Sequence, residues 1–199
     1  MAGSDDVKAS ASTVKLTYDD FLLFPDDGKR HELIDGEHYV TPSPNVSHQR
    51  VAGTLFGVIW THLQSHPIGE VFMAPLDVVM SRHDVVEPDI LYVSNDRRAQ
   101  ILTTLNLQGA PDLAIEVTSK ATRKRDETIK RRLYERGVSE YWVVDPEIAV
   151  VRVYRREGDR FARPRELSRE SGDVLTTPLL PGLEIPLQRI FENDNKTHA

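Results

Sequence analysis

The segment spanning residues 112–144 constrains the fold more strongly than any other part of the chain. Residues 112–118 place Leu113, Ile115 and Val117 on one side of a predicted strand and the intervening side chains on the other. A basic helix is expected over residues 122–136, with Gly137 directly after its end, and the apolar run at residues 141–144 predicts a second strand. A helix that follows one strand and precedes the next is typical of a crossover connection between two strands of the same sheet. The pattern therefore predicts an α/β fold with helices packed on a mixed central β-sheet.

The remaining elements are expected on both sides of this crossover. Before it lie a short capped helix starting after Thr17, a hairpin at residues 31–40 that turns at Asp35-Gly36, a helix at residues 47–66, and strands at residues 71–80 and 88–93. After it, residues 150–154 and 161–167 predict a C-terminal β-hairpin that extends the sheet. We expect one domain over residues 14–191, with disordered tails at residues 1–13 and 192–199.

The composition excludes several kinds of site. The 199-residue chain has no cysteine, so disulfides, thiolate metal sites and cysteine nucleophiles are excluded. It lacks an apolar run of the ~18 residues that a spanning helix needs, and it begins without the pattern of a secretory signal. We therefore expect a cytoplasmic protein that does not bind membranes. The sequence motifs of phosphate loops, dinucleotide-binding folds and zinc peptidases are also absent.

The net charge of −6 is unevenly distributed along the chain. Residues 120–136 contain eight Lys or Arg against three acids, and residues 152–169 contain seven Arg against three acids. Such segments can form a positive face that attracts nucleic acid. A solvated helix and an exposed hairpin are the simpler explanation when the segments are considered alone.

Glu116 is the residue in the predicted crossover that most needs a partner. It lies in mid-strand between Ile115 and Val117, where an ionised side chain is costly to bury without compensation. A solvated face or an arginine pair would compensate it, and so would a metal ion. Mg²⁺ prefers hard carboxylate oxygens and takes only one or two from the protein. Asp112 lies four positions earlier on the same strand, roughly 13 Å away, so Asp89, which begins a different strand, is the better second carboxylate.

The helix that follows carries a polar stripe formed by Arg123, Asp126, Lys130 and Tyr134. Ile129 lies beside this stripe together with Leu133, and we expect both to pack on the sheet. A lysine at position 130 could reach the end of the Glu116 strand and act as a point charge on phosphate or water. Alternatively, it is a surface lysine paired with Asp126.

An ordered set of short sequences carries a resemblance to a known family. The set comprises His31-Glu32-Leu33-Ile34-Asp35-Gly36-Glu37, Ser43-Pro44, His48, Pro75-Leu76-Asp77-Val78, Pro88-Asp89-Ile90, Gly109-Ala110-Pro111-Asp112-Leu113, Glu116, Ser119, Thr122-Arg123, Asp126, Lys130, Tyr134, Gly137-Val138, Glu140-Tyr141-Trp142 and Asp145-Pro146. Over roughly residues 17–190 the chain resembles the Uma family of restriction endonucleases, a branch of the PD-(D/E)XK nuclease superfamily.

The resemblance implies a restriction-endonuclease-like core with Asp89 and Glu116 as catalytic residues and metal ligands. The superfamily lysine would fall at Thr118, a departure from its pattern. In the Uma branch the lysine is displaced onto the next helix, which matches Lys130, with Lys120 as the competing candidate. Glu32 and His48 match further positions of the family, and they are expected, with Arg123, Asp126 and Tyr134, to support the site.

The function implied is that of an endonuclease, a hydrolase that cuts phosphodiester bonds with bound Mg²⁺ or, alternatively, Mn²⁺. The expected partner is nucleic acid, with DNA favoured over RNA, and the expected assembly is a homodimer. The alternative is a catalytically inactive nucleic-acid-binding or scaffold protein on the same fold. If Lys130 pairs with Asp126 at the surface, the pair contributes little to stability, so we also expect replacement of Lys130 to leave the melting temperature nearly unchanged.

Overall fold

The computed structural model describes residues 14–192. Its helical segments are α1 (Tyr18–Phe21), α2 (Val46–Ser65), α3 (Asn95–Ile101), α4 (Arg123–Arg125), the π-helical turn η1 (Asp126–Lys130), α5 (Arg131–Tyr134) and α6 (Leu187–Ile190). Its strands are β1 (Arg30–Ile34), β2 (Glu37–Thr41), β3 (Gly69–Met73), β4 (Val78–Ser81), β5 (Asp84–Val86), β6 (Ile90–Ser94), β7 (Leu107–Gln108), β8 (Leu113–Val117), β9 (Glu140–Asp145), β10 (Val150–Glu157), β11 (Arg160–Phe161), β12 (Arg165–Ser168), β13 (Val174–Thr176) and β14 (Glu184–Pro186).

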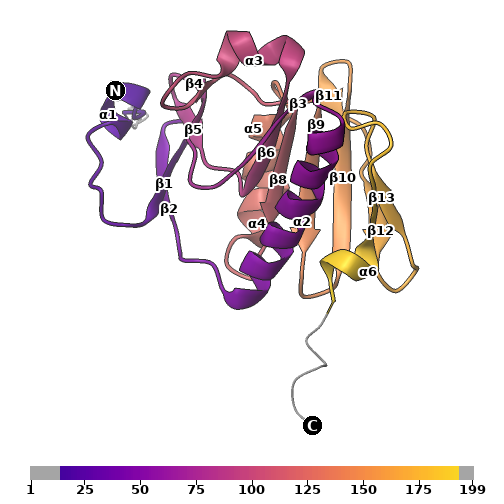
Figure 1. Ribbon diagram of the computed structural model, residues 1–199. Helices are drawn as coiled ribbons and strands as arrows, with labels where there is room; N and C mark the ends of the chain where they lie inside the picture. The colour runs from indigo at the N-terminus through magenta and orange to yellow at the C-terminus, as the bar shows by residue number, and fades with distance from the viewer. Residues whose placement is uncertain (1–13, 193–199) are drawn as a thin grey trace, which may run out of the picture.

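A mixed sheet forms the centre of the described chain (Figure 1). Its strand order is β11-β10-β9-β8-β6-β3, with β12 also paired to β10. The β8–β9 pair is parallel and is joined by the helical segment of residues 123–134, which is the predicted crossover. A second sheet, β2-β1-β5-β4-β7, contains the N-terminal hairpin. The predicted fold class, including the N-terminal hairpin and the C-terminal β extension, is thus confirmed.

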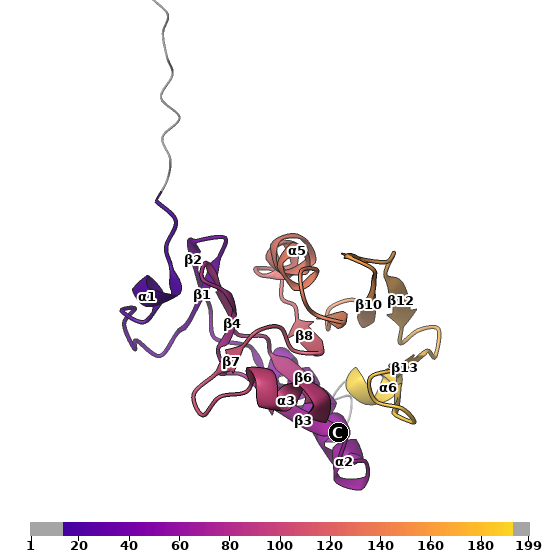
Figure 2. The same cartoon turned by 90° about the horizontal axis from the view of Figure 1, so that it is seen from above.

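Two apolar clusters cover the opposite faces of the central sheet. Leu113, Ile115 and Val117 of β8 pack in one cluster, together with the buried face of α2 and residues from α6 and β14. Ala114 lies in the other cluster, together with Leu133 of α5 and strands of the second sheet. Figure 2 shows α2 and α5 on opposite sides of β8. Because side chains alternate along a strand, Glu116 shares the face of Ala114 and points toward residues 123–134.

The N-terminal hairpin and α2 form close to where the sequence predicts them. Asp35 and Gly36 both have positive φ, 52° and 78°, which a tight two-residue turn between right-twisted strands requires. The helix α2 begins at Val46 rather than at Ser47, since the N-cap is Asn45, whose side chain accepts a hydrogen bond from the His48 backbone N–H at 2.9 Å. This cap places His48 in the first turn of the helix.

Two expectations about local structure are wrong, and several short elements were missed. Residues 71–80 are not one strand but β3 and β4, which belong to different sheets and are separated by Pro75, a residue without a backbone N–H for a ladder. Ile129 does not pack on the sheet and is 38% exposed, because Asp126, Lys130 and Tyr134 occupy the inward face of the helix. The short elements α3, α6, β5, β7, β13 and β14 were not predicted.

The single domain over residues 14–191 stays a prediction. The disorder predicted for the tails falls almost entirely on residues 1–13 and 193–199, which lie outside the described residues. Between residues 14 and 192, no helix combines the length and the apolar character needed to cross a membrane.

Candidate active site

The register of the central sheet brings the two predicted carboxylates together. In the antiparallel β6–β8 pair, Ile90 lies opposite Ile115. The next position outward therefore places Asp89 opposite Glu116, and directly opposed residues have Cβ atoms about 4.5–5.5 Å apart. Both residues are buried, at 4% and 3% exposure, and both line one cavity of about 180 Å³, here called the site cavity. The competing acid, Asp112, accepts hydrogen bonds from the Ser94 backbone N–H and from Arg97, a structural role at the strand entry.

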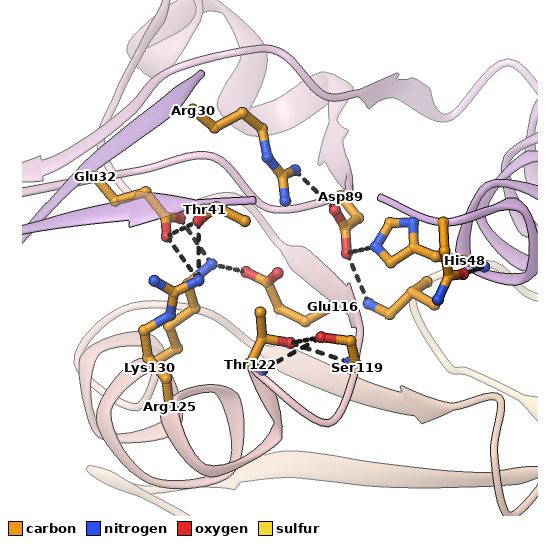
Figure 3. A network of polar contacts seen from close by, with 12 residues as sticks. Arg30, Glu32, Thr41, His48, Asp89, Glu116, Ser119, Thr122, Arg125 and Lys130 are labelled. Carbon is orange, nitrogen blue, oxygen red and sulfur yellow. Dashed lines mark hydrogen bonds and ion pairs between the residues drawn. The ribbon is translucent and has the colours of Figure 1, made fainter. Parts of the chain in front are cut away.

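Asp89 is held by three donors (Figure 3). Its Oδ1 accepts from Arg30 at 2.8 Å, and its Oδ2 accepts from the Val117 backbone N–H at 2.8 Å. The Nε2 of His48 lies 3.0 Å from the same Oδ2. Burial alone would raise the pKa of this carboxyl, but the contacts with His48 and Arg30 outweigh it and lower the pKa of Asp89 to about 2. Asp89 is therefore a fixed, ionised carboxylate at neutral pH.

Glu116 faces the buried ammonium group of Lys130. The Lys130 Nζ lies 2.9 Å from Glu116 Oε1 and 2.7 Å from Glu32 Oε1, so the ammonium bridges the central sheet and β1 (Figure 3). The hydroxyl of Tyr134 donates to the same Glu116 oxygen at 2.8 Å. Lys130 is 1% exposed, and the charges of Glu116 and Glu32 hold its pKa above the ordinary value although burial lowers it. The expected surface pairing with Asp126 is thus wrong.

The other predicted supporting residues divide into two groups. Glu32, His48, Asp126 and Tyr134 lie at or directly behind the site cavity. Arg123 points elsewhere and pairs with Asp145 and Glu147 at 2.8 and 2.9 Å. The competing lysine, Lys120, has a side chain that is 85% exposed and lies 3.7 Å from Glu147. Of the two lysines, only Lys130 lines the cavity.

The carboxylates of the site cavity fit a divalent cation held by few protein ligands. Burial, with repulsion from Asp89, Asp126 and Glu32, raises the pKa of Glu116 despite the nearby Lys130, and a bound cation would oppose both effects. The buried Asp126 Oδ1 has no hydrogen-bond partner within residues 14–192. In the same part of the chain, no three His, Cys, Asp or Glu side chains are grouped as a ready metal site. An ion here would take one or two carboxylates and keep water for its remaining positions, as Mg²⁺ does.

Sequence reasoning missed Arg30, Thr41 and Arg125, three residues that complete the site. Arg30 binds Asp89, while Arg125 donates to Thr41 at 2.9 Å and lies 3.6 Å from Glu32. Arg30 had a detectable signal, because it lies two positions before Glu32 on one strand and therefore shares its face. Arg125 had none beyond its charge, since the π-helical turn that follows it changes the spacing of side chains around the helix axis.

Comparison with known proteins places this arrangement in a family. A family model described as "Uma2: Putative restriction endonuclease" matches residues 18–188. No curated protein matches the chain. A crystal structure from Anabaena variabilis, described as a putative nuclease belonging to DUF820, superposes with a TM-score of 0.75 at 21% identity, covering 89% of this chain and 98% of that one. At that identity the superposition shows the shared fold. The family match extends over nearly all of the described residues, and the chain belongs to the Uma2 family of restriction-endonuclease-like proteins.

Proposed function

We propose that the protein is a metal-dependent endonuclease that hydrolyses phosphodiester bonds of nucleic acid. The observation that supports this proposal is the convergence of Asp89, Glu116 and Lys130 on one cavity that Arg30 and Arg125 also line. Paired carboxylates beside several cations suit a reaction in which negative charge develops on a phosphoryl group. Membership of a family named for restriction endonucleases makes nucleic acid the substrate class, and we propose DNA as the substrate.

Each residue of the proposed site has a physical task. Asp89 and Glu116 would hold Mg²⁺ or Mn²⁺, which when bound lowers the pKa of a coordinated water and withdraws charge from a phosphoryl oxygen. Arg30 and His48 fix the orientation of the Asp89 carboxylate through hydrogen bonds. Glu32 fixes the Lys130 ammonium, which would stabilise charge on the phosphoryl oxygens.

A second candidate is a nucleic-acid-binding protein on this fold that does not cut. One observation favours it: both oxygens of Asp89 already accept hydrogen bonds, so a metal must share them with Arg30 or with His48 and the Val117 backbone N–H. The buried Thr118, at the position of the superfamily lysine, adds no charge.

The nuclease is tested with purified protein, a panel of single- and double-stranded DNA and RNA, and either Mg²⁺, Mn²⁺ or EDTA. We expect cleavage with the metals and none with EDTA. The substitutions Asp89→Asn and Glu116→Gln keep side-chain size and should lower the rate by roughly 100-fold or more. Glu70→Gln, which changes a glutamate paired with Arg98 outside the site cavity, is the matched control and should cut at the wild-type rate.

Metal binding is tested separately from cutting by thermal unfolding. A cation that binds the folded state should raise the melting temperature of the wild-type protein as its concentration rises, and should not do so for Asp89→Asn. If the protein cleaves none of the substrates and neither metal changes its melting temperature, the nucleic-acid-binding protein without cleavage activity is favoured instead. The proposed homodimer is tested by light scattering during gel filtration.

A further inference from the structure

A larger cavity lies beside the site cavity and shares a wall with it. This neighbouring cavity has a volume of about 400 Å³, within the range of about 300–1,000 Å³ that is usual for small-molecule pockets. Arg30, His48 and Asp89 line both cavities, as does the loop of residues 41–44. A molecule that places a phosphate in the site cavity can therefore extend its next group into the neighbouring cavity.

The lining of the neighbouring cavity combines apolar walls with cations near the shared side. Pro42, Pro44, Met73, Ala74 and Pro75 supply apolar surface. Lys29 lines the cavity with a side chain that is 60% exposed, and Arg30 lies at the boundary between the two cavities. A nucleotide has the matching parts, because its base has two apolar faces while its backbone is negatively charged.

Glu87 gives this cavity a polar group without a partner. The residue is 8% exposed and lines the neighbouring cavity. Its backbone N–H donates to Glu32 at 3.1 Å, which ties the residue to the carboxylate that holds Lys130. Its fully buried Oε2, in contrast, accepts no hydrogen bond from any residue between 14 and 192. A buried carboxyl without donors is costly, and a ligand that brings N–H groups removes that cost.

We propose that the neighbouring cavity binds one nucleobase of an unpaired strand next to the scissile phosphate, and that Glu87 selects bases carrying an exocyclic amino group. The inference rests on the proposed function, since it assumes that nucleic acid enters the site cavity. The ionised carboxylate accepts from the amino group of cytosine but finds no such donor at that position on uracil or thymine. A base that inserts into this cavity must first leave the stacked duplex, so the strand is unpaired at this position.

The test compares binding of two short single-stranded oligonucleotides, oligo-dC and oligo-dU, by fluorescence anisotropy in EDTA at pH 8, where the Glu87 carboxyl is ionised. Their bases have the same size; they differ at C4, which carries an amino group in cytosine and a keto group in uracil, and at N3, which carries a proton only in uracil. Wild-type protein should bind oligo-dC at least about fivefold more tightly, the lower end of what one good base contact contributes. Glu87→Gln keeps the side-chain size but adds an amide donor, so the preference should fall below about twofold or reverse.

Glu157→Gln is the matched control, since it changes an exposed glutamate at the end of β10 and should leave the preference for oligo-dC intact. Equal binding of the two oligonucleotides by wild-type protein, no binding of either, or an unchanged preference in Glu87→Gln would overturn the inference. Equal affinity for a dC·dG duplex and for oligo-dC would overturn the claim that the bound strand is unpaired.

The outcome is independent of whether the protein cuts. The binding assay contains no divalent cation, so failure of the nuclease appears as a lack of cleavage while the preference for oligo-dC remains. Loss of the preference in a protein that still cleaves nucleic acid would remove this inference alone.

Discussion

Lys130 lies between two buried carboxylates, and this placement ties the proposed chemistry to folding. The ammonium is within 2.9 Å of both Glu116 and Glu32, which belong to β8 and β1. Removing one partner of a buried ion pair leaves the other charges without compensation, which is far more costly than losing a surface pair. The lysine thus joins the N-terminal hairpin to the central sheet as well as supplying charge to the site cavity.

We expect Lys130→Ala to lower the free energy of unfolding by about 3–5 kcal/mol. For a chain of this size the melting temperature should fall by roughly 10 °C. Any cleavage rate, measured below the new melting temperature, should fall by roughly 100-fold or more because transition-state charge loses its partner. Circular dichroism and a cleavage assay measure the two effects.

Lys120→Ala provides the control, since that side chain is 85% exposed and lies 3.7 Å from Glu147. Exposed pairs contribute little, so its melting temperature should stay within about 1 °C of wild type. If Lys120→Ala abolished cleavage while Lys130→Ala cut normally, the assignment of the lysine to the helix would have to be abandoned.

Glu87 should make the stability of the protein depend on pH. Burial raises the pKa of its carboxyl from 4.5 to about 7 in the folded protein. Below about pH 4.5 the carboxyl is protonated in the folded and the unfolded protein, so it does not change the free energy of unfolding. Between about pH 4.5 and 7 the carboxyl ionises readily only in the unfolded protein, so the free energy of unfolding falls as the pH rises. Above this range the penalty is constant.

Glu87→Gln removes this penalty because an amide does not titrate. We expect the variant to be more stable than wild type at pH 8 by about 1–2 kcal/mol after allowance for solvent screening, and nearly equal to it at pH 4. Thermal unfolding at the two values of pH measures the difference. A gain that is the same at both pH values would assign the effect to packing instead.

At the scale of elements, the end of the crossover helix depends on the close packing of Gly137 against Ala110. Gly137 follows the helical segment, and a Cβ added there would lie 2.6 Å from the Cβ of Ala110, with no flexible side chain to yield. We expect Gly137→Ala to destabilise the protein by about 1–3 kcal/mol, as overpacking usually does. Chemical denaturation measures the change.

Gly53 is the matched control, because it lies inside α2 and an added Cβ would meet nothing within 4 Å. Gly53→Ala should stabilise the protein by up to about 1 kcal/mol, since alanine is the better helix former. Destabilisation of similar size in both variants would contradict the close-approach argument.

The sequence predicts the elements best where periodicity is strong. The alternation at residues 112–118 gave β8 and the correct face for Glu116, and the basic segment gave the crossover helix. Periodicity could not reveal that β3 and β4 enter different sheets, because both are largely apolar and only residues 74–77 separate them. It also could not pair Lys130 with Glu32, since that contact joins a helix to a hairpin remote in sequence. Asp89, Glu116 and Lys130 were candidates from the strand and helix patterns, and the family resemblance added Glu32 and His48, whereas their network of contacts required the fold.

At the scale of the whole molecule, the positive charge available at the two cavities is smaller than the charge of the two basic segments would predict. The two basic segments have local charges of +5 and +4 in a protein of net charge −6. Much of the first segment is neutralised: Lys130 bridges two carboxylates and Arg123 pairs with two more. Arg30, Arg125 and Lys29 line the two cavities, and each pairs with only one carboxylate among the described residues, so we expect at most about three phosphate contacts for a strand bound there.

The salt dependence of binding tests this charge arrangement. For a single strand the logarithm of the binding constant falls with the logarithm of salt concentration by about 0.7 for each phosphate contact. Three contacts predict a slope of about −2 and an affinity loss of about 20-fold between 50 and 200 mM salt. Lys29→Gln should reduce the slope by about 0.7, because it removes one exposed cation at the cavity. Arg163→Gln, in the second basic segment, should leave the slope unchanged. The opposite result, with Arg163→Gln reducing the slope and Lys29→Gln neutral, would place the bound strand on the C-terminal β extension and away from Asp89 and Glu116.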